Sequence, residues 1–70
     1  MDTPRIQLGK QIKKLRVKAG LTQEKLAIAV GIDYKYLQKI EGKNPPAIRI
    51  DTIDKIAKAL KTTPSGLLDF

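Results

Sequence analysis

Apolar residues recur at helical spacing in the first quarter of the chain. Leu8, Ile12 and Leu15 fall on one helical face and predict a first helix from residue 5 or 6 to residue 18. Lysines occupy its other faces, as on an ordinary solvated surface. The pattern stops before Gly20, and glycine readily adopts the left-handed conformation that closes many helices. We therefore expect Gly20 to supply the C-cap.

Two shorter helices are predicted next. Thr22 is a favourable N-cap for a helix that runs to Val30, where Gly31 ends it. A third helix starts from Asp33 as its N-cap and ends near residues 41–42. So short a gap between the two helices requires a tight turn, which glycine makes best because it tolerates positive φ.

Prolines and threonines organise the remainder of the chain. Residues 43–50 contain two adjacent prolines and are predicted to form a loop. A fourth helix begins at Asp51, and its apolar face comprises Ile53, Ile56, Ala57 and Leu60. Thr63 and Pro64 have the order of an N-cap and a first helical residue, which predicts a short last helix. No segment alternates long enough to predict a strand, so we expect an all-α fold of five helices.

Composition limits what this fold can do. Seventy residues make one domain, spanning 1–70, with a small core. The sequence has no cysteine and no histidine, which excludes disulfides and disfavours a zinc site. The commonest general base and the commonest soft nucleophile are therefore missing. We expect no enzyme activity, no metal, no cofactor and no small-molecule substrate.

The charge is strongly and unevenly positive. The net charge is +7, and residues 1–43 hold ten basic against four acidic side chains (10 − 4 = +6). Residues 44–70 hold four against three (4 − 3 = +1). One polyanion-binding face is the interpretation we favour over a merely soluble, lysine-coated surface. No signal peptide or membrane-spanning run is present, so we expect an intracellular protein with no membrane partner.

The second and third predicted helices together have the spacing of a helix-turn-helix unit, at about residues 22–42. Where two such helices cross steeply, a small residue must lie between their backbones, and Ala27 fits that place. Their apolar residues point to one core: Leu26, Val30, Ile32, Leu37 and Ile40.

The run LTQEKLAIAVGI…YLQKIEGK, with a basic amphipathic helix before it and IDKIAKALKTTPSGLL after it, resembles the lambda-repressor-like (Cro/CI, XRE-type) helix-turn-helix family. The resemblance covers residues 6–69, and its elements match in order. It implies a compact five-helix DNA-binding domain with a central helix-turn-helix. It also implies a cytoplasmic protein of bacterial or phage type that binds double-stranded DNA.

The third predicted helix has two different faces. At 100° per residue, Leu37 and Ile40 share a face with Glu41, while lysines and an amide project roughly opposite. Ammonium and amide donors suit base edges and phosphates in a major groove. The resemblance assigns the base-facing role to Tyr34, Lys35, Gln38 and Lys39. The alternative for these lysines is an ordinary solvated surface.

Phosphate contacts are predicted around this helix. Gln23 lies in the first turn of the second helix, whose free amide groups favour a phosphate, although it could be an ordinary exposed glutamine. Thr22 beside it is more simply explained as a cap. Lys43 and Asn44 match the phosphate-gripping loop of the family. Tyr36 either contacts a phosphate or covers the edge of the core.

Two further sets follow from the resemblance. Arg16 and Glu41 align with a partly buried ion pair that joins the first and third helices, and a planar guanidinium suits such a site. Asp33 departs from the family pattern, in which Ser or Thr is common at the start of the third helix. The candidates for a homodimer contact are Ile48, Leu67, Leu68 and Phe70, although Leu67 or Leu68 could belong to the core.

The function predicted from these residues is a sequence-specific transcriptional regulator, a repressor before an activator, that binds a two-fold operator as a homodimer. The alternative is an antitoxin or a restriction–modification controller whose role includes binding a protein partner such as a toxin. A basic domain that binds RNA or anionic membrane without sequence preference explains the charge but not the helix-turn-helix spacing.

Overall fold

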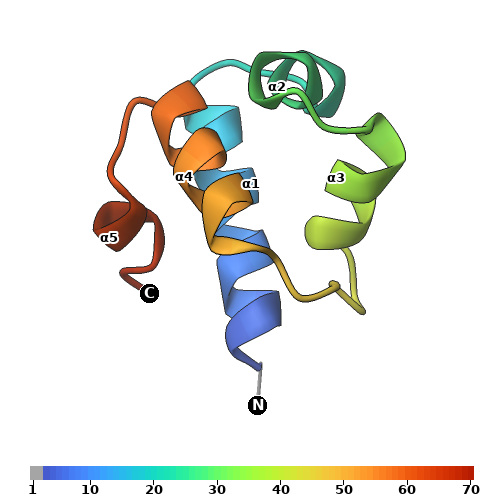
Figure 1. The fold of residues 1–70 in the computed structure, drawn as a ribbon, viewed down its shortest axis with the longest axis vertical. Helices are drawn as coiled ribbons and strands as arrows, with labels where there is room; N and C mark the ends of the chain where they lie inside the picture. Colours follow the sequence, from blue (N-terminus) through green and yellow to red (C-terminus); the bar gives the residue numbers. More distant parts are fainter. Residues whose placement is uncertain (1–2) are drawn as a thin grey trace.

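The computed structural model describes residues 3–70 and contains the five helices shown in Figure 1. Their bounds are α1 Pro4–Lys18, α2 Gln23–Val30, α3 Tyr34–Ile40, α4 Ile50–Ala59 and α5 Pro64–Leu67. The described residues include no strand, so the predicted all-α fold is confirmed. None of these helices has the length and apolar character needed to cross a membrane. The predicted starts of α1 and α4 were each at least one residue late.

Threonine side chains begin three of the helices. The Oγ1 atoms of Thr3, Thr22 and Thr63 accept hydrogen bonds from backbone N–H groups three residues later, at 3.4, 3.1 and 3.0 Å. These bonds satisfy amides that would otherwise lack a partner in the first turn. Asp33 also occupies an N-cap position, but its side chain makes no capping hydrogen bond. The predicted N-cap position of Asp33 is thus confirmed.

The turn between α2 and α3 is closed by the predicted glycine. Gly31 has φ +82° and lies in the left-handed region, where a side chain would be strained. The backbone N–H groups of Gly31 and Ile32 both donate to the carbonyl oxygen of Ala27, at 2.8 and 3.0 Å. This pattern ends α2 abruptly, and α3 then runs in a clearly different direction (Figure 1).

All five helices contribute to one core. Its fully buried large side chains come from every helix: Ile12, Leu26, Leu37, Ile40, Ile56 and Leu67. Ala27, the small residue predicted to lie where α2 and α3 cross, is also buried. The loop that joins α3 to α4 is anchored as well, because Pro45 is buried and Pro46 is half-buried. The core therefore fixes both the helix-turn-helix unit and the loop that follows it.

A glycine within α1 sets the distance between α1 and α3. A Cβ atom added to Gly9 would overlap the carbonyl oxygen of Ile40, the last residue of α3. The atoms that it would meet belong to the backbone of Ile40 and Glu41, so no flexible side chain can move aside. The sequence gives little warning of this contact, because a lone glycine in a helix is compatible with many explanations.

We expect Gly9→Ala to lower the free energy of unfolding by about 1–3 kcal/mol, because it forces α1 and α3 apart. In an exposed helix the same change would raise stability by about 1 kcal/mol, so the sign of the effect is informative. Chemical denaturation followed by circular dichroism measures it. Lys14→Ala, at an exposed position of α1, is the control and should change stability little. A Gly9→Ala protein as stable as the parent would contradict the close approach.

Candidate nucleic-acid interface

The helix α3 presents one buried face and one exposed face. Leu37 and Ile40 are fully buried, whereas all four residues predicted to face bases are exposed: Tyr34, Lys35, Gln38 and Lys39. Tyr36 is half-buried and packs against the core. Of the two roles considered for Tyr36, phosphate contact and cover of the core edge, this geometry supports cover of the core edge.

A shallow cleft joins the exposed face of α3 to the turn after it. It is lined by Lys35, Gln38, Lys39, Gly42, Lys43 and Asn44. Three of the four predicted base-facing residues and two of the predicted phosphate contacts therefore lie on one continuous surface. Tyr34, the first residue of α3, is exposed but does not line this cleft.

The cleft beside α3 is cationic. Three of its six lining residues are lysines, and none carries a carboxylate. The nearest acidic residue in sequence on the C-terminal side of α3 is Glu41, which the structure directs inward instead. Positive groups at an open surface, with amide donors beside them, match a nucleic-acid backbone and base edges in charge and hydrogen bonding.

A buried ion pair holds α3 from behind. Arg16 of α1 donates from Nε and Nη2 to the two carboxylate oxygens of Glu41, at 2.9 and 3.0 Å. The Arg16 side chain is 10% exposed and that of Glu41 is 2% exposed. Arg16 also donates from Nη1 to the carbonyl oxygen of Leu21, at 2.8 Å. The predicted pair thus exists and is bidentate, which is the strong geometry for these groups.

The same carboxylate also binds α2. Gln23 donates from Nε2 to Oε1 of Glu41 at 3.2 Å, an interaction between separate helices that the sequence pattern does not predict. Gln23 is half-buried, and Thr22 before it is exposed and caps α2. The capping role of Thr22 is confirmed. Contact of Thr22 or Gln23 with a phosphate stays a prediction.

An apolar cleft lies beside the chain's C-terminal residues, near the start of α1. It is lined by Pro4, Arg5, Leu8, Ala47, Ile48, Leu68 and Phe70. Three of the four dimer candidates therefore lie together, with Leu68 and Phe70 about half exposed. Leu67 is fully buried in the core of its own chain and has no surface to offer, so its assignment to a dimer contact is wrong.

Among residues 3–70 there is no cluster of three or more metal-ligating side chains. Among the described residues, every buried side-chain nitrogen and oxygen, including those of Arg16 and Glu41, has a hydrogen-bond partner.

A family model described as helix-turn-helix matches residues 12–67, which includes the Arg16 pair, α2, α3 and α4. The chain belongs to the helix-turn-helix family. As a member of it, this helix-turn-helix protein is a DNA-binding transcriptional regulator, and the resemblance to XRE-type proteins is confirmed.

The chain is similar to three proteins with known names. It is 36% identical over 67 residues to the control protein C.BamHI of Bacillus amyloliquefaciens, a match that covers 94% of this chain and 82% of that protein. The restriction-modification controller protein C.AhdI from Aeromonas hydrophila has 32% identity and a TM-score of 0.83, over 89% of this chain and 92% of that one. SinR, a master regulator for biofilm formation solved in complex with DNA, has 29% identity and a TM-score of 0.83, over 89% and 98%. SinR has also been solved with the SinI protein.

We expect Arg16→Ala to lower the free energy of unfolding by about 3–5 kcal/mol, because Glu41 would stay buried without its cation. Thermal denaturation measures the loss. The control is Lys58→Ala, which breaks the exposed pair with Asp54 on α4, whose side chains are 75% and 41% exposed, and should change stability by less than about 1 kcal/mol. An unchanged melting temperature for Arg16→Ala would show that the pair does not hold the fold.

Proposed function

We propose that this protein binds a specific sequence of double-stranded DNA with α3 in the major groove and regulates transcription from that site. The observation that carries the proposal is the exposed face of α3. This second helix of a helix-turn-helix unit presents Lys35, Gln38 and Lys39 together at a cationic cleft. A major groove admits one helix and displays acceptors and donors that such side chains can distinguish.

The proposed roles differ along this surface. Lys35, Gln38 and Lys39 contact base edges, and Tyr34 contacts them from the first turn of α3. Lys43 and Asn44 contact phosphates from the turn that follows. On the other side, Thr22 and Gln23 place the first turn of α2 near a phosphate, since its free amides and the helix dipole favour an anion. Phosphate contacts fix the register of α3, and base contacts supply the specificity.

The proposed active form is a homodimer on a two-fold operator. Ile48, Leu68 and Phe70 provide a partly exposed apolar surface for it. In a two-fold dimer of helix-turn-helix units, the two recognition helices bind half-sites about 34–36 Å apart. Repression is the proposed outcome, by occupation of the operator in the bacterial cytoplasm, and no cofactor or metal is part of the proposal.

A second role is favoured by the relatives. The control protein C.BamHI is similar over nearly this entire chain, and C.AhdI is a restriction-modification controller. A controller of this kind is compatible with the same DNA-binding surface. The complex of SinR with SinI makes a protein partner a further candidate.

Selection of bound duplexes from a random pool tests the main proposal. We expect the enriched sequences to form an inverted repeat with its half-sites one helical turn apart. Failure to enrich any sequence over the starting pool would overturn sequence-specific binding. The same selection with Gln38→Ala should relax the preference at one or two positions in each half-site. Lys14→Ala, on the exposed side of α1, is the matched control and should return the parental sequence.

The dimer surface is tested separately by Leu68→Glu, which places a charge in the apolar cleft. We expect sedimentation equilibrium to show a larger fraction of monomer than for the parent protein at the same concentration. Val17→Glu is the control, because Val17 is 60% exposed and lines none of the clefts described above. An equal shift for both variants, or none for Leu68→Glu, would remove this surface from the proposal.

A further inference from the structure

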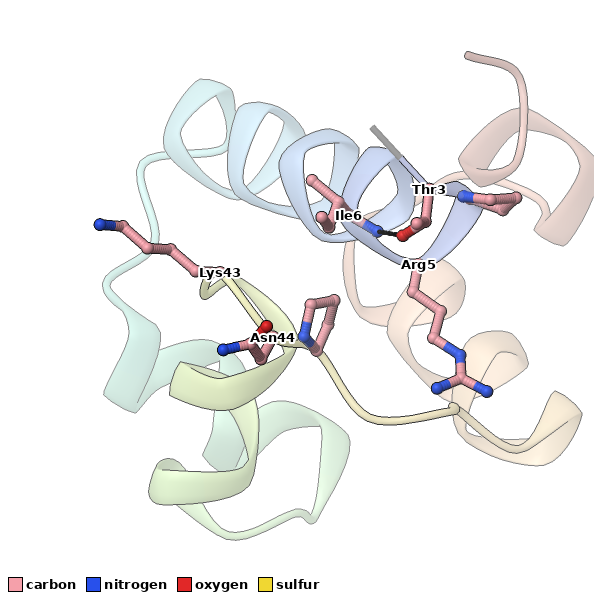
Figure 2. A pocket seen from close by; sticks show the side chains of 7 residues that line it. Thr3, Arg5, Ile6, Lys43 and Asn44 are labelled. Carbon is pink, nitrogen blue, oxygen red and sulfur yellow. Dashed lines mark hydrogen bonds between the residues drawn. The ribbon is translucent and has the colours of Figure 1, made fainter. Parts of the chain in front are cut away.

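A second cleft lies between the first turn of α1 and the turn that follows α3 (Figure 2). It is lined by Thr3, Pro4, Arg5, Ile6, Lys43, Asn44 and Pro45. Its cations are Arg5 and Lys43, and no lining residue carries a carboxylate. The only hydrogen bond drawn inside it is the Thr3 cap to the N–H of Ile6 (Figure 2).

This cleft is continuous with the cationic cleft beside α3. The two share Lys43 and Asn44, so the turn after α3 forms the boundary between them. A third depression is lined by residues of both regions, with Ile6 and Lys10 on one side and Glu41, Gly42 and Lys43 on the other. Glu41 is the one acidic residue in its lining, and its side chain is 2% exposed and bound to Arg16. The exposed face of α3 is therefore connected to the first turn of α1 by a surface whose one carboxylate is buried and paired.

Arg5 has an unusual place on α1. At 100° per residue it lies on the same helical stripe as Gly9, Ile12 and Arg16, all of which are buried. Arg5 alone on this stripe is exposed, because it lies one turn beyond the core and overhangs the cleft. Arg5 therefore lies on the side of α1 that faces α3, at the edge of the proposed DNA-binding surface, and not on the outer side of α1.

The two cations of this cleft do not converge on one point. In Figure 2 the charged ends of Arg5 and Lys43 extend from the cleft in different directions. Such a pair does not enclose a single small anion. It matches a row of anionic groups, and the phosphates of one DNA strand recur about every 3.4 Å along the helix axis.

We propose that Arg5 contacts the phosphate backbone of the bound duplex, so that the first turn of α1 extends the interface beyond the helix-turn-helix unit. Arg5 and Lys43 contact different phosphates of that backbone, and the shared cleft accommodates the backbone between them. This inference depends on the proposed function, because it requires the same duplex that α3 reads. The contact is independent of sequence: it strengthens binding to every duplex alike.

Arg5 also borders the apolar cleft that contains the dimer candidates. A long arginine stem can line apolar surface while its charged end lies in solvent, so the two positions are compatible. The competing assignment is that Arg5 serves the dimer contact rather than DNA. We favour DNA because Arg5 shares the other cleft with Lys43, a second cation, and a dimer contact between two identical copies gains nothing from that charge.

Salt dependence of binding measures the proposed contact. Equilibrium binding of the parent protein, Arg5→Ala and Lys14→Ala is measured between 50 and 300 mM salt, on the selected operator and on an unrelated duplex. Loss of one phosphate contact reduces the magnitude of the slope of log K against log salt by about 0.9 for each protomer bound. We expect this reduction for Arg5→Ala on both duplexes. Lys14 lies nine residues further along α1, half a turn away in angle, and its removal should leave the slope unchanged.

Arg5→Lys keeps the positive charge and should keep most of the parental slope. An unchanged slope for Arg5→Ala, or an equal reduction for Lys14→Ala, would overturn the local contact while leaving DNA binding by α3 intact. If Arg5→Ala instead raises the monomer fraction in sedimentation at an unchanged slope, Arg5 belongs to the dimer contact and the inference is wrong. Absence of any enriched sequence for the parent protein would be a failure of the proposed function itself, and is distinguishable from these results.

Discussion

The bidentate contact between Arg16 and Glu41 is the interaction on which the presentation of α3 depends. With seven residues, α3 is too short to be stable as an isolated helix, and it buries only two side chains of its own. Glu41 follows it directly, and the pair attaches its C-terminal end to α1. Burial of both charges is tolerable because every side-chain nitrogen and oxygen of the pair has a hydrogen-bond partner, including the third bond from Arg16 to Leu21.

The same carboxylate connects the other half of the helix-turn-helix unit. Since Gln23 donates to Glu41, the first turn of α2, the end of α3 and the last turn of α1 meet at one polar junction within a largely apolar core. The exposed face of α3 and the N-terminal turn of α2 are therefore held in a fixed relation before any ligand is bound. Little conformational entropy remains to be lost on binding when the contacting groups are arranged in advance.

Much of this architecture is local and could be predicted from the sequence. Threonine caps, glycine turns and helical periodicity act over a few residues. Together they predicted where each helix begins and ends to within about two residues. The Arg16 pair came from the family resemblance. Relations between distant segments were less accessible. Whether Leu67 or Leu68 is buried depends on the phase of a four-residue helix, which no periodicity determines. The bond from Gln23 to Glu41 depends on the crossing of α2 and α3, and the charged surface at Arg5 depends on where the core ends.

The close approach at Gly9 has a consequence for how this scaffold can change. The contact is made by backbone atoms of α1 and α3 and involves none of the outward side chains of α3. The orientation of α3 against α1 therefore does not depend on which residues occupy positions 34, 35, 38 and 39. In the proposed function these residues contact bases, so substitutions there would change the operator that is bound while the orientation of α3 stays the same. On that proposal, a chain of this size diversifies its recognition at a handful of positions without a change in its core.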